Sequence, residues 1–197
     1  AAQVSGVLPS GVTGGSGLTS LGTVTAGNLA NTAIVYPVGH VLQVKSTVVT
    51  DRNSSTLHDT SSTGTDCGLN VTIVPKSNTS DFFLTFSVGI CGAPLSNSIG
   101  FILSKDGTKI GNGVDVDARN GIWTKSIRYS IDTNHGFGAS ATYLDTVSGL
   151  GSRAYKVGLI SQNTNPVYIN RSASGVNDIL VYGSYTSSSL TVFEIQG

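Results

Sequence analysis

Residues 68–91, GLNVTIVPKSNTSDFFLTFSVGIC, contain the pattern that decides the fold class of this chain. In the first part Leu69, Val71 and Ile73 alternate with polar residues, which is the period of a strand with one buried face. The second part, residues 81–91, is strongly apolar, and residues 75–80 between them carry Pro, Lys, Ser and Asn, which favour turns. The stretch therefore predicts two strands joined by a turn, and a hairpin if that turn reverses the chain.

Similar short runs recur along the rest of the chain. Strands are expected at residues 40–50, 68–74, 81–91, 99–104, 108–116, 122–132, 139–144, 153–161, 166–170, 178–185 and 190–195. No stretch has the apolar spacing of a helix. Many short strands with frequent turn signals predict an all-β, antiparallel sandwich of the jelly-roll type. We expect the final strand to pair with an early one, which would protect the sheet edges.

The two cysteines flank this opening stretch and allow two interpretations. In a hairpin Cys67 would stand opposite Cys91, so a cross-strand disulfide is geometrically possible. The alternative is two buried thiols, because free Cys is among the most buried residue types. We favour the thiols, since we expect assembly in a reducing cytoplasm, where disulfides are rare.

Residues 1–35 differ from everything after them, because they contain no charged side chain and only single Val, Leu or Ile residues among small and polar ones. One such segment buries too little apolar surface to offset the ordering of its backbone, whereas several copies wound together can do so. We therefore predict a homotrimer with an extended Gly/Ser/Thr-rich stalk over residues 1–36 and a head domain over residues 37–197. The residues expected on the stalk axis are Val4, Val7, Leu8, Val12, Leu18, Leu21, Val24 and Leu29.

The charge balance excludes several classes of function. The chain has 11 acidic and 11 basic residues, and charged residues make up only 11% of it. It therefore lacks the basic field that nucleic-acid binding needs and the polybasic patch that binds anionic membranes. No apolar run approaches the ~18 residues of a membrane-spanning helix. We expect no nucleic acid and no membrane insertion.

Catalytic patterns are also missing. Glu194 is the only glutamate, so a paired-carboxylate glycan depolymerase would depend on aspartates that lie beside turns, where Asp is common. The candidates for such a pair are Asp115, Asp117, Asp132 and Asp145. No His or Cys has metal-site spacing, and no GxSxG motif occurs. We expect no enzyme activity, no metal and no cofactor.

Residues 123–143 are the richest in aromatic side chains. Trp123 and Tyr129 share strand parity with isoleucines, which favours a place in the core. His135 and Phe137 lie in the expected turn 133–138 and should be exposed. These two residues are our candidates for receptor contact, because aromatic faces beside polar groups are suited to binding sugars.

The order of segments resembles the C-terminal region of phage tail-fibre and related virion proteins, which are common in viruses of marine bacteria and cyanobacteria. The segments that carry the resemblance are HVLQV, NVTIVPKSNTSDFFLTFSV, FILSKDGTKIGNG, YLDTVSGLGSRAYKVGLIS and SLTVFEIQG, preceded by a connector-like SGVLPSGVTGGSGLTSLG. Val147 stands where that family usually has Pro, and Phe82–Phe83 where it has Lys-Ile. The resemblance spans most of residues 37–197 and implies a homotrimeric β-sandwich head with no cofactor. It carries over no catalytic residue.

These patterns together predict a non-enzymatic virion protein, the distal part of a trimeric tail fibre. It would be assembled in the host cytoplasm and exposed on the particle surface. We expect it to contact other virion proteins through its N-terminal side and a bacterial surface glycan or protein through its head. Three copies would turn a weak single-site affinity into avidity. The alternative is a structural virion component, such as a capsid decoration, head fibre or tail-assembly protein, that stabilises or links parts of the particle.

Overall fold

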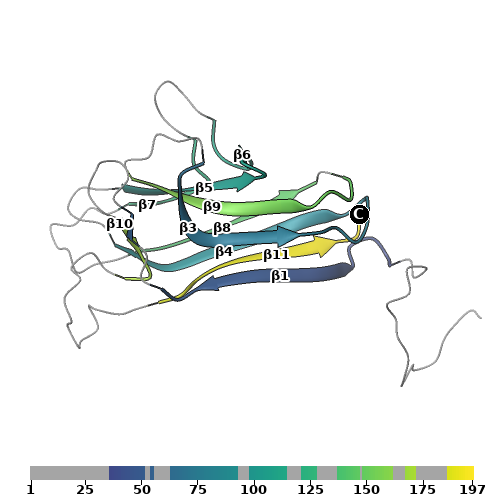
Figure 1. The fold of residues 1–197 in the computed structure, drawn as a ribbon, viewed down its shortest axis with the longest axis horizontal. Helices are drawn as coiled ribbons and strands as arrows, with labels where there is room; N and C mark the ends of the chain where they lie inside the picture. The colour runs from purple at the N-terminus through teal and green to yellow at the C-terminus, as the bar shows by residue number, and fades with distance from the viewer. Residues whose placement is uncertain are drawn as a thin grey trace, which may run out of the picture. The chain divides into compact units, whose positions relative to one another are not determined.

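Two antiparallel sheets form the part of the chain described by the structure, which is a computed structural model (Figure 1). The described residues are 36–51, 54–55, 63–92, 98–114, 121–127, 137–146, 148–161, 167–171 and 186–197. The chain divides into two units, Ala1–Val35 and Tyr36–Gly197. The predicted stalk with its axial candidates, Val4 to Leu29, therefore lies outside the described residues.

All regular elements of the described residues are strands. Their bounds are β1 Val41–Val49, β2 Ser54–Ser55, β3 Thr65–Ile73, β4 Asp81–Gly92, β5 Ser98–Lys105, β6 Thr108–Lys109, β7 Thr124–Ile127, β8 Phe137–Asp145, β9 Arg153–Ser161, β10 Val167–Ile169 and β11 Ser188–Ile195. Within these ranges no helix is long and apolar enough to cross a membrane. The fold is all-β, as the sequence predicts.

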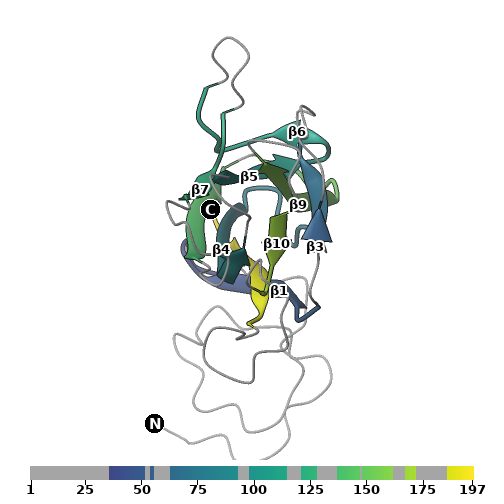
Figure 2. The ribbon, with the colours of Figure 1, turned by 90° about the vertical axis from the view of Figure 1, so that its left-hand side faces the viewer.

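The two sheets lie as separate layers, which Figure 2 shows from one end of the strands. Sheet A has the order β1-β11-β4-β10-β2, and β8 also pairs with β4. Sheet B has the order β3-β9-β5-β6, and β7 also pairs with β5. The late strand β11 lies between β1 and β4, so the expected pairing of the final strand with an early one is confirmed.

Alternating side chains of both sheets make the core. In β3 the burial pattern follows the predicted period, with Leu69 and Ile73 fully buried. The rings of Phe86 and Phe101 meet across the two sheets with centroids 5.0 Å apart. Trp123 packs on the same cluster, 5.4 Å from Phe86, and its Nε1 donates to the Thr142 carbonyl at 3.3 Å. Trp123 is therefore partly buried against the core, on the side that its parity predicts.

The hairpin over residues 68–91 is wrong, because β3 and β4 belong to different sheets. β3 pairs with β9, whereas β4 pairs with β11 and β8. The connection over residues 75–80 crosses between the sheets and is held by a buried carboxylate. Oε1 of Glu194 accepts hydrogen bonds from the Lys76 amide at 2.6 Å and from the Ser80 hydroxyl at 2.6 Å. Alternation predicts which face a side chain takes but not which strand lies beside it.

Both cysteines are buried thiols that form no disulfide, so the thiol interpretation describes this structure. Cys67 lies in sheet B and its Sγ donates to the Val157 carbonyl at 3.0 Å, whereas Cys91 lies in sheet A. Burial raises the pKa of Cys67 to about 11 and that of Cys91 to about 12. Each thiol is therefore protonated at neutral pH and a poor nucleophile.

The expected strand over residues 108–116 is also wrong beyond its start, because β6 ends at Lys109. Gly111 has a φ of 63°, which turns the chain away from the sheet. The Asn112 carboxamide then takes the place of a strand: Oδ1 accepts from the Leu103 amide at 3.1 Å and Nδ2 donates to the Leu103 carbonyl at 2.6 Å. Residues 178–185 lie outside the described part of the chain, and β2 is a strand that the sequence did not predict.

Candidate functional site

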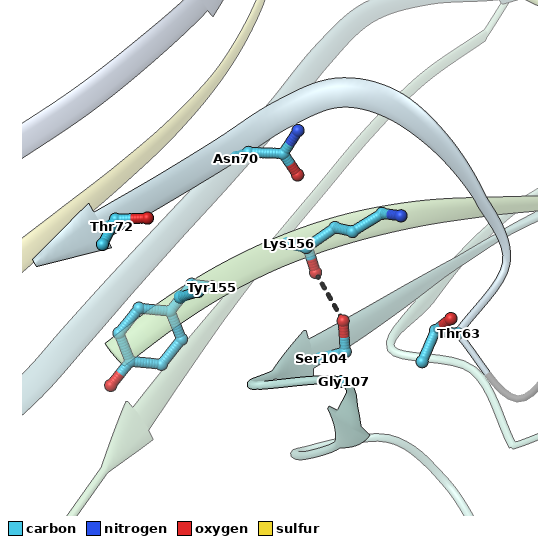
Figure 3. A pocket seen from close by; sticks show the side chains of 8 residues that line it. Thr63, Asn70, Thr72, Ser104, Gly107, Tyr155 and Lys156 are labelled. Carbon is cyan, nitrogen blue, oxygen red and sulfur yellow. Dashed lines mark hydrogen bonds between the residues drawn. The ribbon is translucent and has the colours of Figure 1, made fainter. Parts of the chain in front are cut away.

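A pocket of about 240 Å³ opens on the outer face of sheet B, over β3, β9 and the turn between β5 and β6 (Figure 3). We call it the β3–β9 pocket. Its lining residues are Thr63, Asn70, Thr72, Ser104, Gly107, Ala154, Tyr155 and Lys156. Asn70 and Thr72 face outward because their neighbours Leu69, Val71 and Ile73 point into the core. The pocket therefore offers hydroxyl, amide and ammonium groups, but most of its accessible surface is apolar.

Two of the lining residues, Asn70 and Lys156, belong to a cluster with Asp66. Both carboxylate oxygens of Asp66 accept from Asn70 Nδ2 at 3.1 Å, and Oδ1 also accepts from the Gly68 amide at 2.7 Å. Lys156 Nζ lies 3.6 Å from Asp66 Oδ2. Burial raises the pKa of Asp66, but these hydrogen bonds and Lys156 outweigh that effect and leave the pKa below its ordinary value. The carboxylate, carboxamide and ammonium groups of this cluster thus hold one another in place.

Hydrogen bonds between Asp106 and the backbone of Ala154 fix the opposite rim of the pocket. The amide of Ala154 donates to Asp106 Oδ1 at 2.9 Å, and the amide of Asp106 donates to the Ala154 carbonyl at 2.9 Å. Asp106 and Gly107 both have positive φ, 51° and 80°, which closes the tight turn between β5 and β6. The Ser104 hydroxyl donates to the Lys156 carbonyl at 3.4 Å, as the dashed line in Figure 3 marks. A ligand would meet a preformed rim.

Tyr155 contributes no aromatic face to the pocket. Its ring points away from Asn70 and Lys156 in Figure 3, and its hydroxyl donates to Asp145 Oδ2 at 2.7 Å inside the protein. Burial, the hydrogen bond to Asp145 and its charge raise the pKa of Tyr155 far above the ordinary value. The phenol therefore stays protonated and packs in the core. The pocket suits a ligand that combines hydrogen-bonding groups with some apolar surface.

Asp145, one of the four aspartates considered for a carboxylate pair, is a buried ion-pair partner. It is 2% exposed, and Lys105 Nζ lies 2.9 Å from its Oδ2. The carboxylate faces the interior, where Lys105 and the Tyr155 hydroxyl fix it. Asp115, Asp117 and Asp132 lie outside the described residues. In the described ranges no three His, Cys, Asp or Glu side chains come together as a metal site.

Four strands of sheet A carry two unlike rows of side chains back to back. The inner polar row consists of Gln43, Glu194 and Asp145 together with the apolar Phe82, and the four are in register across β1, β11, β4 and β8. The adjacent outer apolar row consists of Val44, Phe193, Phe83 and Leu144. In the outer row the Phe83 and Phe193 rings have centroids 6.2 Å apart, and Val44 and Leu144 are 49% and 47% exposed. The outer face thus presents an apolar stripe to solvent.

Hydroxyl groups fill the rest of that face. The next two outward rows are Ser46, Thr191, Thr85 and Thr142, then Val48, Ser189, Ser87 and Ser140. No charged side chain stands in these three rows. These three rows of sheet A are therefore uncharged, and Asp81 stands in the next outward position of β4, while the outer face of sheet B carries Asp66 and Lys156.

The residues proposed from the sequence for receptor contact are not part of the β3–β9 pocket. Phe137 begins β8 in sheet A and is 43% exposed, so its expected exposure is confirmed, but it belongs to the other sheet. His135 lies outside the described residues. Sequence reasoning missed Asn70 and Lys156, because polar residues at alternate strand positions look like any solvent-facing set.

Comparisons with known proteins identify no relative of this chain. The likeness to phage fibre proteins therefore rests on the order of its sequence segments. No protein-family model matches the chain, and a search of curated proteins finds none that matches it.

Proposed function

We propose that this chain is a non-enzymatic virion protein, the distal part of a trimeric phage tail fibre that attaches the particle to a bacterial surface glycan. The observation that carries the proposal is the unlike chemistry of the two outer faces. Sheet B carries a pocket with hydroxyl, amide and ammonium groups beside apolar surface, and sheet A carries three outward rows of apolar and hydroxyl side chains. One face suits recognition of a polar ligand and the other suits assembly.

The head would be a jelly roll. The strand order supports this: the main strands run β1-β11-β4-β8 in sheet A and β3-β9-β5-β7 in sheet B. Successive long strands change sheet repeatedly, from β1 to β3 to β4 to β5 and from β8 to β9 to β11. Such alternation is the consequence of two Greek-key connections, and jelly rolls of this kind are frequent in viral proteins. Residues 1–36 would form the interwound stalk and join other virion proteins.

The β3–β9 pocket would take a sugar unit of the receptor. Sugar hydroxyls both donate and accept, and Asn70, Thr72 and Lys156 supply both kinds of group. At about 240 Å³ the pocket is smaller than the ~300–1,000 Å³ of drug-binding sites, so the affinity of one site would be weak. Three equivalent pockets on a trimer would raise the overall avidity by ~10²–10⁴.

The test is direct binding of the full chain to bacterial glycans. The labelled chain is applied to an array of purified bacterial surface polysaccharides and to whole marine bacterial cells. Replacing Asn70→Ala together with Lys156→Ala should lower binding at least tenfold, because two groups that would contact the sugar are lost. The matched control is Asn78→Ala with Lys76→Ala, two exposed positions of the same residue types outside the pocket.

Saturable binding that is lost in the pocket variant and kept in the control supports the proposal. Equal binding by both variants would show that the pocket does not bind the glycan. No binding to any polysaccharide or cell, with an intact trimer by light scattering, would contradict attachment. That last result would favour the second candidate, a structural virion component.

A structural virion component remains the second candidate because the outer apolar row of sheet A suits a contact within the particle. In that case particles without the head should be fragile or incomplete. In the attachment case such particles should be intact and should fail to adsorb. Counting particles by electron microscopy beside an adsorption assay separates the two.

A further inference from the structure

Two neighbouring cross-strand pairs line the β3–β9 pocket, and they differ in chemistry. Asn70 on β3 stands opposite Lys156 on β9, and the next outward pair along the same strands is Thr72 opposite Ala154. The first pair offers a carboxamide and an ammonium group, whereas the second offers two methyl groups and one hydroxyl. The pairs are about 6.8 Å apart along the strands, so one sugar unit can contact both.

The Asn70 carboxamide has a defined orientation. Its Nδ2 lies 3.1 Å from both oxygens of Asp66, and an ionised carboxylate only accepts hydrogen bonds, so the NH₂ group must face it. Figure 3 shows the Asn70 oxygen on the side of Lys156 and the nitrogen turned away. Among the described residues no donor binds this oxygen. The pocket therefore presents an acceptor, Asn70 Oδ1, beside a donor, Lys156 Nζ.

Apolar surface next to these two groups limits the ligand further. Most of the accessible surface of the pocket is apolar, and the methyl groups of Thr72 and Ala154 and the aliphatic stem of Lys156 are among the groups that line it. A ligand with hydroxyl groups alone would satisfy the donor and the acceptor but leave the apolar surface uncovered. A ligand with a methyl group beside one donor and one acceptor covers that surface as well.

The charges around the pocket do not favour an acidic ligand. Lys156 is the charged residue among those that line it, and its Nζ already lies 3.6 Å from Asp66 Oδ2. On the opposite rim the Asp106 carboxylate accepts from a backbone amide, and Lys109 on β6 stands opposite Ser104. Two carboxylates and two ammonium groups thus stand around the pocket. They leave no excess of positive charge for the carboxylate of a uronic acid or for a phosphate.

We infer that the β3–β9 pocket takes an uncharged N-acetylated sugar in preference to the parent hexose and to a uronic acid. The acetamido N–H donates to Asn70 Oδ1, its carbonyl oxygen accepts from Lys156 Nζ, and its methyl group packs against Thr72 and Ala154. The N–H and C=O of a planar trans amide point in opposite directions, which suits an acceptor on β3 and a donor on β9. The inference rests on the glycan attachment proposed above and names the class of sugar that the pocket selects.

Pairs of sugars that differ only in the acetamido group test the inference. The full chain is titrated with N-acetylglucosamine and glucose, and with N-acetylgalactosamine and galactose, and binding is followed by saturation-transfer NMR of the sugar protons. Each N-acetylated sugar should bind roughly tenfold more tightly than its parent hexose. Its methyl protons should receive the largest saturation. Glucuronic acid at low salt should bind no better than glucose.

Two variants test whether the preference comes from the pocket. Ala154→Tyr places a ring over the apolar part at an exposed strand position, where aromatic residues are favourable, and should abolish the preference for the N-acetylated sugar. The matched control is Leu150→Tyr, at a position that is 58% exposed and outside the pocket lining. Asn70→Ala needs no extra space and should weaken binding of N-acetylglucosamine about fivefold through loss of the acceptor.

Equal binding of the N-acetylated and parent sugars, tighter binding of glucuronic acid, or a preference that survives Ala154→Tyr and Asn70→Ala would overturn the inference. If the chain binds a bacterial polysaccharide through Asn70 and Lys156 but shows no such preference, glycan attachment stands and only the sugar class is wrong. If the chain binds no polysaccharide, cell or sugar, both proposals are wrong.

Discussion

The inner polar row and the outer apolar row of sheet A occupy the same four strands, one residue apart, and they have opposite chemistry. In the inner row Asp145 is balanced by a cation, Lys105, whereas Glu194 is balanced by neutral donors from Lys76, Ser80 and Gln43. In the outer row no side chain has a polar group at all. The inner row stabilises the folded head, and the outer row is partly exposed to solvent. The following substitutions separate these two roles.

The largest effect is expected at Asp145. Replacing Asp145→Ala would leave Lys105 and the Tyr155 hydroxyl without their partner in the interior, which costs about 3–5 kcal/mol for a buried pair. Urea denaturation at fixed protein concentration, followed by Trp123 fluorescence, measures the loss. Replacing Asp145→Leu together with Lys105→Met should recover much of it, because no charge is then left unpaired. A loss below ~1 kcal/mol for the single variant would contradict a stabilising role for the ion pair.

A smaller effect is expected at Glu194. Replacing Glu194→Gln keeps the shape but sets a new NH₂ group against Gln43 Nε2 or against the amides of residues 76 and 77, at a cost of about 1–3 kcal/mol. Faster hydrogen exchange at the Lys76 and Ser77 amides should accompany it. Unchanged exchange there would show that the carboxylate does not hold the connection between β3 and β4.

The outer row should behave in the opposite way. Replacing Leu144→Ser should change the free energy of unfolding of one head by about 1 kcal/mol or less, because the side chain is 47% exposed. The same change should weaken contact between heads, read as a shift toward monomer on dilution in analytical ultracentrifugation. Leu150→Ser, 58% exposed and off these strands, is the matched control. Equal dilution behaviour in both variants would mean that the outer row makes no contact.

The smallest effect is expected on sheet B, where Asp66 is mostly exposed. The pKa of Asp66 is lowered in the folded chain, so its contribution to stability is present above the unfolded value near 3.8 and is lost as the pH falls through the folded value. The difference in free energy of unfolding between the parent and the Asp66→Asn variant should therefore be constant from about pH 5 to 8. It should shrink toward zero below about pH 4. Thermal unfolding at several pH values tests this. A difference that grows as the pH falls would have the wrong sign.

Strand positions were predictable from sequence where apolar alternation is regular. The expected strand over residues 153–161 coincides with β9, and that over 81–91 is one residue shorter than β4. Strand alternation also predicts that Glu194 faces the core, since it shares parity with Leu190 and Val192, which are buried. Its polarity alone would suggest the opposite face. Parity was the stronger signal because backbone amides and hydroxyls were available to bind the carboxylate inside.

Features that depend on contacts between distant segments were not predictable. The pairing of β3 with β9 rather than β4 depends on the crossing at residues 75–80, which Glu194 fixes from far along the chain. The Asn112 side chain takes the place of a neighbouring strand beside Leu103. It does so through hydrogen bonds that no alternation pattern records. The β3–β9 pocket needs the lateral register of three strands. Local sequence carries none of these.

The central place of β11 also governs when the head can form. β1 pairs only with β11 among the described strands, and Gln43 and Glu194 in these strands are 151 residues apart. During synthesis β1 therefore lacks its described neighbour until β11 is made, and both rows remain incomplete until β11 leaves the ribosome. A polypeptide interrupted before residue 188 lacks Phe193 and cannot present the outer apolar row. A chain that lacks this strand therefore cannot complete sheet A.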